Sequence, residues 1–348
     1  MNDIIKEDLE IIYQSGLDWE KFKNATVLVT GANGMLASYM VFMLAFLSEK
    51  IPGLNLKIIA LCRNLKKAKK RFGDFLDSPF FYIRCDDITE KLDFEGSIDY
   101  IIHAASPASS QFYGIDPVGV IAPNVFGTKN LLELARAKKS KGFLFFSSGE
   151  VCGTMDKPLI SEEDSGYLNQ MDIRSCYGES KRMGENMCQC WHHQYQVPAV
   201  AVRPEHTYGP TIDLENDKRV FAEFVSNVVR NKDIVIKSDG SPVRTFCYIA
   251  DATAGFFNVL LNGKRGESYN VGNENGRISI GELANLLVAM WPEKKLKVIY
   301  EKRAAGKDYL ENKNKVRPTL SIAKIQKLGY QCRFSVRDGF YRTIKSFI

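Results

Sequence analysis

The stretch that decides the fold is TVLVTGANGMLASYMVFMLAFL, residues 26–47. Its first five residues are β-branched or apolar, which predicts a buried parallel strand. Two glycines and a small alanine follow at once, and the apolar run after them predicts a helix. Small residues between a strand and a helix let the backbone approach a pyrophosphate, which the positive end of the helix attracts. The stretch therefore predicts a dinucleotide site that includes Gly31, Asn33, Gly34, Met35 and Leu36.

Strand-like and helix-like segments alternate on the C-terminal side of this stretch. Further strands are predicted at 56–62, 80–84, 99–105, 142–146 and 199–203. A long helix is predicted from Asp116 to Ala137, with the polar Asn124 among apolar residues. A buried asparagine needs partners, and we expect it to bridge to main-chain groups near the helix that follows 175. The alternation predicts an α/β fold with a doubly wound parallel sheet of the Rossmann type.

A second informative stretch runs from Phe145 to Lys181 and includes FFSSGEVCG and SCYGESKRMGE. The first piece predicts a buried strand that delivers Ser148 and Glu150 to a turn at its end. The second predicts a helix on which Tyr177 and Lys181 leave from one face, because they are four residues apart. A nearby ammonium favours phenolate over phenol. Tyr177 is therefore a candidate base for a hydroxyl proton, and Ser148 a candidate for orienting the substrate.

The other strand ends supply the remaining candidate contacts to the cofactor. An NAD site usually offers an acidic residue to the adenosine ribose, whereas this chain has Arg63 after the second strand. Arginine suits a 2′-phosphate and favours NADP slightly, but it also stacks on adenine, so both cofactors stay open. Asp87, followed by Ile88, is placed at the adenine edge or serves as a turn residue. The small Ala104 and Ala105 leave room for the ribose and nicotinamide.

Composition narrows the class of protein. The 348 residues are 45% hydrophobic and 25% charged, with a net charge of +6, which suits an ordinary globular chain and an anionic small ligand. None of the eight cysteines forms a CxxC pair, and the four histidines make no metal constellation. The start is acidic and amphipathic, unlike a signal peptide, and the apolar run at 40–47 is too short for a membrane span. We expect a cytoplasmic protein without a metal, nucleic-acid or membrane partner.

Five motifs in order carry a family resemblance: TGANGMLA, HAAS, SSGEV, YGESK and RPEHTYGP. Together they resemble the extended short-chain dehydrogenase/reductase superfamily, and within it the nucleotide-sugar epimerases, dehydratases and decarboxylases. The resemblance implies tightly bound NAD or NADP and a nucleotide-diphosphate sugar as substrate. It implies that Tyr177 is the base, that Lys181 holds the nicotinamide ribose and lowers the pKa of Tyr177, and that Ser148 binds the hydroxyl at sugar C4. Hydride transfer from C4 would give a 4-keto sugar.

The two residues after Ser148 bear on the outcome. In the 4,6-dehydratases that the chain resembles they are Asp and Glu, but here they are Gly149 and Glu150, so the acid that expels water is missing. The UDP-glucuronate decarboxylases have Ser and Glu there, and residues 217–229 are also similar to theirs. Decarboxylation of a UDP-glucuronate-like nucleotide-hexuronate is therefore favoured. A C4 or C5 epimerase, a 4-keto reductase and a 4,6-dehydratase stay open as alternatives, with a non-catalytic dinucleotide sensor last.

Further substrate contacts follow from the resemblance. Arg244 matches an arginine that faces the pyrophosphate or the sugar acid, and Arg219 matches the segment that lines the base. Arg317 aligns with a phosphate-contacting arginine, although a surface ion pair explains it equally well. Glu205 stands where many members have an apolar residue, and its charge would disfavour an acidic sugar unless it is paired. The expected substrate-binding residues are Ser106, Ser148, Glu205, His206, Arg219, Val220, Arg244 and Arg317.

The resemblance also suggests how the chain is divided. We expect a helical extension at 1–22, a dinucleotide-binding domain at 23–206 and about 244–272, and a smaller nucleotide-sugar-binding domain at 207–243 and 273–348. Helices at 279–291, 321–330 and 335–348, each with a serine at its start, are predicted in the last segment. The helices around 118–137 and 175–195 carry more apolar residues than one buried face needs. The resemblance suggests that they pair across a two-fold axis in a homodimer.

Overall fold

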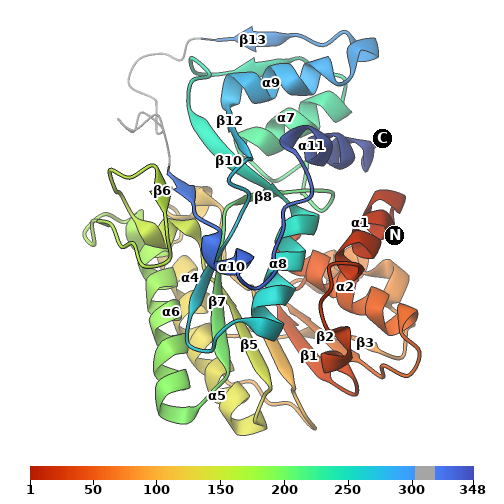
Figure 1. The fold of residues 1–348 in the computed structure, drawn as a ribbon, viewed down its shortest axis with the longest axis vertical. Helices are drawn as coiled ribbons and strands as arrows, with labels where there is room; N and C mark the ends of the chain where they lie inside the picture. Colours follow the sequence, from red (N-terminus) through yellow and green to blue (C-terminus); the bar gives the residue numbers. More distant parts are fainter. Residues whose placement is uncertain (302–317) are drawn as a thin grey trace.

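A sheet of seven parallel strands forms the centre of the molecule (Figure 1), and the prediction of a doubly wound parallel sheet is confirmed. The computed structural model describes residues 1–301 and 318–348. The strand order is β11-β7-β5-β4-β1-β2-β3, and each neighbouring pair is parallel. The strands are β1 (Thr26–Thr30), β2 (Lys57–Cys62), β3 (Phe81–Cys85), β4 (Tyr100–His103), β5 (Gly142–Phe146), β7 (Ala199–Pro204) and β11 (Ser268–Val271).

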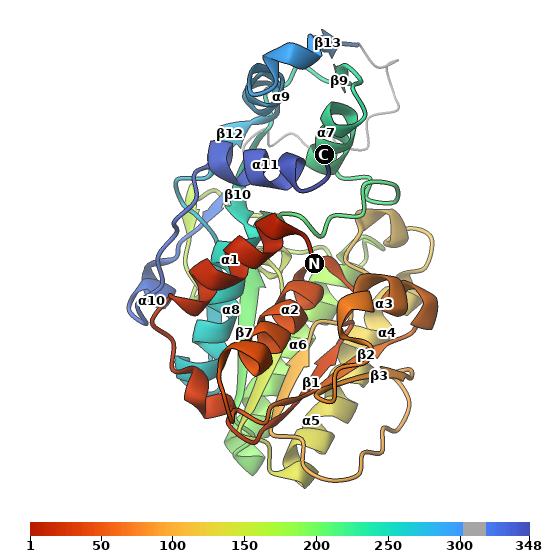
Figure 2. The ribbon, with the colours of Figure 1, turned by 90° about the vertical axis from the view of Figure 1, so that its right-hand side faces the viewer.

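Both faces of this sheet are covered, which explains why its central strands are apolar throughout. On β1, Val27 and Val29 face a core shared with α2 (Met35–Lys50) and α8 (Ile249–Asn262). Leu28, between them, faces a second core shared with helices on the other side. Those helices are α5 (Thr128–Lys138) and α6 (Ser175–Tyr195). Figure 2 shows α1 (Asp3–Tyr13), α2 and α8 along one face of the sheet.

The predicted long helix from Asp116 to Ala137 is interrupted. It consists of α4 (Pro117–Ala122), a π-helical turn η4 (Pro123–Gly127) and then α5. Pro123 has no N–H to continue the α-helical pattern, and a π turn absorbs the irregularity. The turn contains Asn124, whose side-chain amide donates to the Val120 carbonyl and to Ser180 Oγ, each at 3.0 Å. Asn124 thus joins this helix to α6, in line with the expected bridging role.

The N-terminal helix α1 is tied into the fold by one buried carboxylate. Asp8 is fully buried and accepts hydrogen bonds from the hydroxyls of Tyr39 on α2 and Tyr248 at the start of α8. It also accepts a hydrogen bond from Arg342 Nε at 2.9 Å. Arg342 lies on α11 (Val336–Lys345), so Asp8 connects α2 and the start of α8 with the C-terminal helix.

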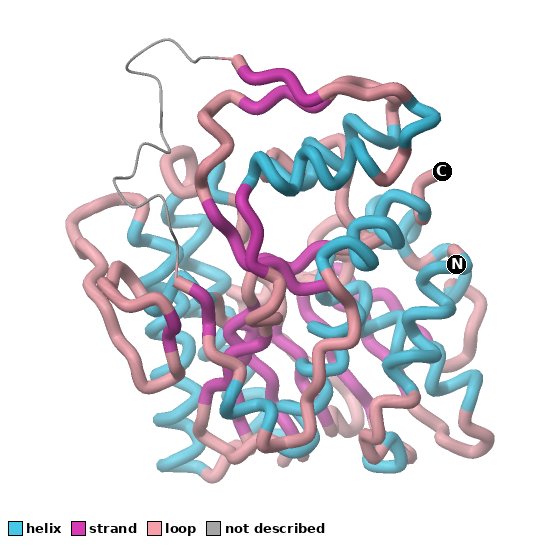
Figure 3. Tube along the Cα trace, turned by 45° about the horizontal axis from the view of Figure 1, so that its top comes forward, coloured by secondary structure: helices cyan, strands magenta, loops and turns pink. Residues whose placement is uncertain are grey.

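A smaller unit lies beyond the carboxyl ends of the strands (Figure 3). It contains the sheet β12-β10-β8, the strand pair β13-β9 and helices packed beside them. Its elements are β8 (His206–Tyr208), α7 (Val220–Val229), β9 (Ile234–Ile236), β10 (Val243–Tyr248), β12 (Arg277–Ser279), α9 (Ile280–Ala289), η6 (Pro292–Lys294), β13 (Val298–Tyr300) and α11. The remaining short elements are η1 (Trp19–Phe22), α3 (Leu65–Arg71), η2 (Gly73–Phe75), η3 (Ser110–Phe112), η5 (Gly149–Cys152), β6 (Leu159–Ile160), β14 (Thr319–Leu320) and α10 (Ala323–Gln326).

Two of the three predicted C-terminal helices begin as expected, and the third is much shorter. Ser279 caps α9 in a capping box with Glu282, and Ser335 caps α11. The helix predicted at 321–330 is reduced to the single turn α10, because the Ser321 N–H still pairs with the Ile160 carbonyl of β6 and Gly329 has a left-handed φ of +87°. Across the described residues, no helix has the length and apolar character that a membrane crossing needs.

Candidate active site

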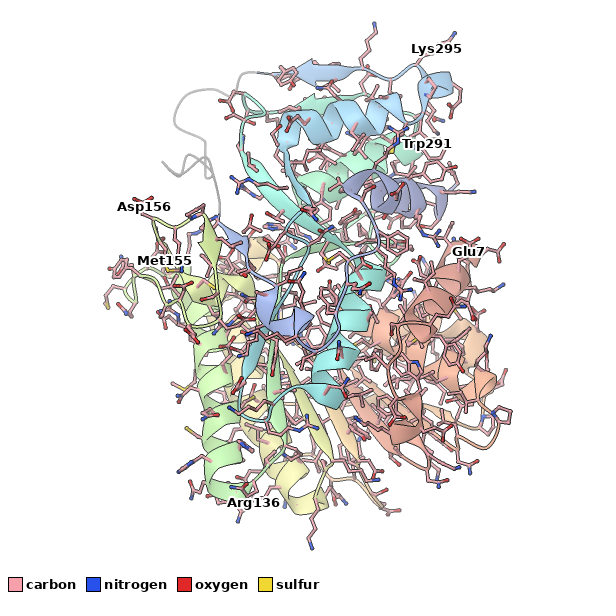
Figure 4. All side chains as sticks on the ribbon, viewed as in Figure 1. Glu7, Arg136, Met155, Asp156, Trp291 and Lys295 are labelled. Atoms are coloured by element: carbon pink, nitrogen blue, oxygen red, sulfur yellow. The ribbon has the colours of Figure 1, made fainter. Side chains whose placement is uncertain are left out.

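The carboxyl end of β5 faces the smaller unit. Figure 4 labels Arg136, near the end of α5, at the bottom of the molecule, whereas Met155 and Asp156, which follow η5, lie well above it on the left-hand side, below the smaller unit. The strand β5 therefore runs upward and delivers the residues after Phe146 to the space between the two units. Ligands of doubly wound sheets bind at this edge.

Ser148 and Tyr177 meet at this edge. Ser148 begins η5, and its Oγ accepts a hydrogen bond from the Glu150 N–H at 3.2 Å. The Ser148 hydroxyl lies near the Tyr177 phenol and acts to lower its pKa. The Tyr177 ring is 7% exposed and stacks on Tyr113, with centroids 5.0 Å apart and planes at 13°. The structure thus brings together the two hydroxyls that the sequence predicted, with the Glu150 backbone next to them and its side chain exposed.

Lys181 lies one helical turn further along α6 and is buried. Its Nζ donates to the Phe146 carbonyl at 2.6 Å and lies 5.8 Å from the centre of the Tyr177 ring. Burial lowers the pKa of Lys181 to about 7. The ammonium is therefore fixed against the end of β5, on the predicted face of the helix.

The predicted effect of Lys181 on Tyr177 is corrected by the structure. Burial raises the pKa of Tyr177 to about 12, and the Ser148 hydroxyl and the charge of Arg219 act in the opposite direction. The Lys181 Nζ donates its hydrogen bond to the Phe146 carbonyl and not to the Tyr177 hydroxyl. Helical spacing predicts that two side chains share a face, but it does not predict how deeply each is buried. The charge of Glu150 raises the pKa of Tyr177 and the charge of Arg219 lowers it, and burial outweighs both.

Arg219 comes from the smaller unit and reaches the start of α2. It precedes α7, and its guanidinium pairs with Asp217 and lies 3.6 Å from the Met35 sulfur. Met35 is the first residue of α2, so Arg219 stands beside the helix terminus at which the sequence predicted a pyrophosphate. Val220, next in the chain, is 36% exposed. The structure therefore joins two residues that were predicted separately, one for the nucleotide base and one for the cofactor.

The turn between β1 and α2 fits a dinucleotide. Gly31 has a φ of +63°, and a Cβ there would lie 2.6 Å from the Ala105 backbone. The Gly34 N–H donates to the Gly31 carbonyl at 2.8 Å, and Gly34 directly precedes α2. Within the described part of the chain, no side chain caps this helix, so its N–H groups point into the space before it. Asn33, Met35, Leu36 and Ala104 are half-buried around the turn.

The adenosine end is more exposed. Arg63 lies at the surface after β2, and Cys85 Sγ donates to its carbonyl at 3.4 Å. Asp87 Oδ1 accepts from the N–H and the hydroxyl of Thr89, and these hydrogen bonds lower the pKa of Asp87, with a further contribution from Arg63. Of the two roles expected for Asp87, the turn role is thus seen directly. Ile88 is buried in the core shared with α5.

Comparison with known proteins agrees with this geometry. The model of the NAD dependent epimerase/dehydratase family matches residues 27–272. The chain belongs to this family. The UDP-glucuronic acid decarboxylase 6 of Arabidopsis thaliana is 30% identical over 320 residues, 91% of this chain and 87% of the relative. The dTDP-D-glucose 4,6-dehydratase of Homo sapiens is 29% identical over 334 residues, with 92% and 89% covered.

A solved structure supports the fold. The UDP-glucuronic acid 4-epimerase of Bacillus cereus in complex with NAD superposes with a TM-score of 0.74 at 24% identity. The match covers 92% of this chain and 99% of the epimerase. The resemblance stated from the five sequence motifs, including the likeness to the UDP-glucuronate decarboxylases, is confirmed by these comparisons.

Within this epimerase/dehydratase chain, Glu205 occupies the joint between the two units. Its Oε1 accepts from the Leu320 N–H at 3.3 Å, and the neighbouring Thr245 hydroxyl acts to lower the pKa of the carboxyl group. Burial raises the pKa of Glu205 to about 8. A Cβ added to Gly272 would lie 2.5 Å from Oε2. At neutral pH Glu205 is therefore mostly protonated, so it carries little of the negative charge that was expected to disfavour an acidic sugar.

Leu320 is a residue of the site that sequence reasoning missed. It is 5% exposed and packs with Val151, Cys152 and Ile160. A Cβ added to Gly149 would lie 3.2 Å from Leu320 Cδ1, so the leucine fills the space in front of the glycine. The only sequence signal was its nearness to Arg317, a predicted phosphate contact that lies outside the described residues.

His103 is a second residue that the sequence did not single out. Its two ring nitrogens lie 2.9 Å from Thr30 Oγ1 and 3.1 Å from Thr128 Oγ1. Burial lowers the pKa of His103 to about 3, so the ring is neutral and joins β1 and β4 to α5. The HAAS motif was the signal that could have identified it.

The remaining predicted substrate residues lie on strands of the smaller unit or at the edge of the large sheet. His206 on β8 packs edge-on against Phe246, with ring centroids 6.0 Å apart. Arg244 on β10 is half-buried and donates to the Val243 carbonyl at 2.8 Å. Ser106 is half-buried after β4.

Several buried oxygens at this edge lack a hydrogen-bond partner within residues 1–301 and 318–348. They are Ser106 Oγ after β4, Ser147 Oγ after β5, Glu205 Oε2 after β7 and Asn124 Oδ1 in η4. Buried polar groups in native proteins are nearly always hydrogen-bonded. Their gathering at the carboxyl edge of the sheet fits a polar ligand there. The same described residues contain no group of three or more His, Cys, Asp or Glu side chains suited to a metal ion.

Proposed function

We propose that the protein oxidises a nucleotide-linked hexuronate, such as UDP-glucuronate, at sugar C4 with bound NAD or NADP and then releases the C6 carboxylate as carbon dioxide. The observation that carries this proposal is the juxtaposition of Ser148 and Tyr177 at the end of β5, with Lys181 held at the Phe146 carbonyl. The position of these residues beside the glycine turn of β1 and α2 supports hydride chemistry. The likeness to UDP-glucuronic acid decarboxylases supports the choice of substrate.

The first step is the removal of a proton from the C4 hydroxyl. Ser148 binds this hydroxyl, and Tyr177 accepts its proton. The Ser148 hydroxyl and the charge of Arg219 lower the barrier to ionising the buried phenol. A bound NAD or NADP would supply the hydride acceptor for C4, and the sugar would then be a ketone for part of the cycle. Lys181, held at the Phe146 carbonyl, is placed to hold the nicotinamide ribose.

The second step is the loss of the carboxylate. A ketone at C4 lies β to the C6 carboxylate, so the electron pair of the C5–C6 bond can move into it. This step needs no acid to expel a hydroxyl, which suits a chain with Gly149 after its active-site serine. Glu205 agrees with an acidic substrate, because burial raises the pKa of this carboxyl to about 8 and keeps it largely neutral.

In this proposal, one part of the chain binds the dinucleotide and another binds the nucleotide sugar. The sheet, 23–206 with about 244–272, binds the dinucleotide, with Arg63 at a 2′-phosphate and Asp87 near the adenine. The smaller unit, 207–243 with 273–348, binds the nucleotide sugar through Arg219, Val220, His206 and Arg244. The exposed apolar side chains of Val118, Phe126 and Met183, on α4, η4 and α6, support a homodimer through these helices.

A direct assay tests the reaction. The purified protein is incubated with UDP-glucuronate, and carbon dioxide and UDP-pentose are measured, with the Tyr177→Phe variant as control. Formation of both products in equal amounts, lost in the variant, supports the proposal. Formation of UDP-galacturonate without carbon dioxide would instead identify a C4 epimerase. No turnover with UDP-, dTDP-, CDP- and GDP-linked sugars, while NAD still binds, would identify a dinucleotide sensor.

A further inference from the structure

Leu320 supplies the side chain that Gly149 lacks. Gly149 follows Ser148, the residue proposed to bind the substrate hydroxyl. A Cβ built there would lie 3.2 Å from Leu320 Cδ1 and 3.7 Å from Cδ2. The surface next to Ser148 is therefore apolar, and it comes from a segment far away in the sequence.

The position of Leu320 is fixed by its backbone. Strand β14 pairs with β6, and the N–H groups on either side of Leu320, those of Thr319 and Ser321, donate to the Pro158 and Ile160 carbonyls at 2.9 and 2.7 Å. The Leu320 N–H itself donates to Glu205 Oε1.

Two further side chains hold the residues next to it. The Ile322 N–H donates to Glu274 Oε1 at 2.8 Å, and Asn270 Nδ2 donates to the Ser321 carbonyl at 3.0 Å. The backbone hydrogen bonds fix where the side chain starts, and packing against its apolar neighbours on η5 and β6 restricts its rotation. Leu320 is thus a fixed apolar wall and not an adaptable loop residue.

We propose that Leu320 determines the outcome of the reaction by placing an apolar surface against the C6 carboxylate of the bound sugar. This inference rests on the proposed decarboxylation. With no side-chain hydrogen-bond donor at residue 149 and the leucine methyl groups beside it, the carboxylate loses part of its hydration. A localised charge in apolar surroundings is unfavourable unless it is paired.

The chemistry relieves this cost. As the C5–C6 bond breaks, its electron pair moves into the C4 ketone and forms an enolate, and the carboxylate leaves as neutral carbon dioxide. A proton then adds to C5 and restores the ketone, so charge and atoms balance. The negative charge is more dispersed in the transition state than in the carboxylate. An apolar wall therefore destabilises the ground state more than the transition state and favours carbon dioxide loss over return of the hydride to an intact hexuronate.

Two variants of similar size test the role of the wall. Leu320→Asn introduces an amide that can hydrogen-bond to the carboxylate, whereas Leu320→Met keeps an apolar side chain and serves as the control. With UDP-glucuronate, carbon dioxide release and C4 oxidation are measured separately, the latter by the absorbance of the reduced nicotinamide and by mass spectrometry of the 4-keto hexuronate. We expect Leu320→Asn to lose about tenfold or more in carbon dioxide release, with C4 oxidation within roughly threefold of wild type. The Leu320→Met variant should keep both rates.

Three other results would contradict the inference, and each points to a different error. An unchanged rate of carbon dioxide release in Leu320→Asn, with the wild type active, overturns the role of Leu320 alone. Equal losses of both steps in Leu320→Asn and Leu320→Met reduce Leu320 to a packing residue. A wild-type protein that releases no carbon dioxide overturns the proposed function, and the inference falls with it.

Discussion

The two sides of the candidate site are built in different ways. On one side, Ser148, Tyr177 and Lys181 come from one strand end and one helix. Short sequence motifs predicted all three. On the other, Glu205, Thr245 and Leu320 come from three separate segments, and Leu320 is 115 residues away from the glutamate that binds its N–H. The first side presents polar groups to a substrate. On the second side, the Glu205 carboxyl accepts a hydrogen bond from the Leu320 backbone, and the side chain next to Gly149 is a leucine. In the proposed function, one part of the chain therefore carries out the oxidation, and another part favours one product over the alternatives.

The largest effect is expected on the motif side. Replacing Tyr177 with Phe removes the proposed base but keeps the ring that stacks on Tyr113. We expect the turnover rate to fall by about 10²- to 10⁴-fold, as for the loss of a general base, with NAD affinity within roughly twofold. Steady-state kinetics and NAD titration measure the two quantities. A mild loss of rate would contradict the role of Tyr177 as the base.

On the side formed by Glu205, Thr245 and Leu320, the Glu205 carboxyl makes the free energy of unfolding depend on pH. Its folded pKa, about 8, lies above the ordinary value of 4.5, so its stabilising contribution is complete below about pH 4.5 and is lost as pH rises through 8. Removing this titration in Glu205→Gln should leave stability near that of wild type at about pH 5. At about pH 9 the variant should be more stable by on the order of 3 kcal/mol.

Urea denaturation of both proteins at the two pH values measures this difference. The acidic measurement is the internal control, because both side chains are neutral there. An advantage of the Gln variant that is equal at both pH values would contradict a buried, protonated Glu205.

The fit between Gly149 and Leu320 predicts a smaller, coupled effect. An aspartate at 149 would press against the leucine, so Gly149→Asp should cost about 1–3 kcal/mol of stability, as overpacking does. Leu320→Ala should recover part of this cost in the double variant, although it opens a cavity when made alone. A double-mutant cycle from chemical denaturation gives the coupling energy. Strictly additive effects would mean that the two side chains do not compete for one space.

The smallest effect is expected at the adenosine end, which belongs to neither side. Arg63 is exposed, so Arg63→Ala should leave stability unchanged. It should weaken NADP about tenfold, the value of one hydrogen bond between charged groups, and NAD by less than roughly twofold. Titration with each dinucleotide measures the ratio. Equal losses for both would assign Arg63 to the adenine face and not to a 2′-phosphate.

Much of the fold could be predicted because it depends on local patterns. The apolar run at 26–30 and the turn after it predict a strand, a tight bend and a helix, and these are the elements observed. The shared face of Tyr177 and Lys181 follows from helical spacing in the same way. Burial does not follow from spacing, and for this reason the expected lowering of the Tyr177 pKa was wrong.

The residues that were missed depend on contacts across the chain. Nothing near Leu320 in the sequence indicates that it faces Gly149, and a glutamate after a strand gives no sign that it will be buried under a backbone N–H. The break in the predicted helix at Pro123 is an intermediate case. The proline was visible, but the π turn that accommodates it also depends on the hydrogen bond from Asn124 to α6.

The buried carboxylate of Asp8 has a consequence for how the chain folds during synthesis. Its partner Arg342 follows 334 residues later, so α1 leaves the ribosome long before the group that neutralises it exists. Until α11 emerges, Asp8 has the hydroxyls of Tyr39 and Tyr248 as partners but not the guanidinium of Arg342. Burying the carboxylate without this positive charge is unfavourable, so we expect α1 to be loosely attached at that stage. The cofactor half therefore reaches its final form only when the last helix docks, although most of its strands are translated early.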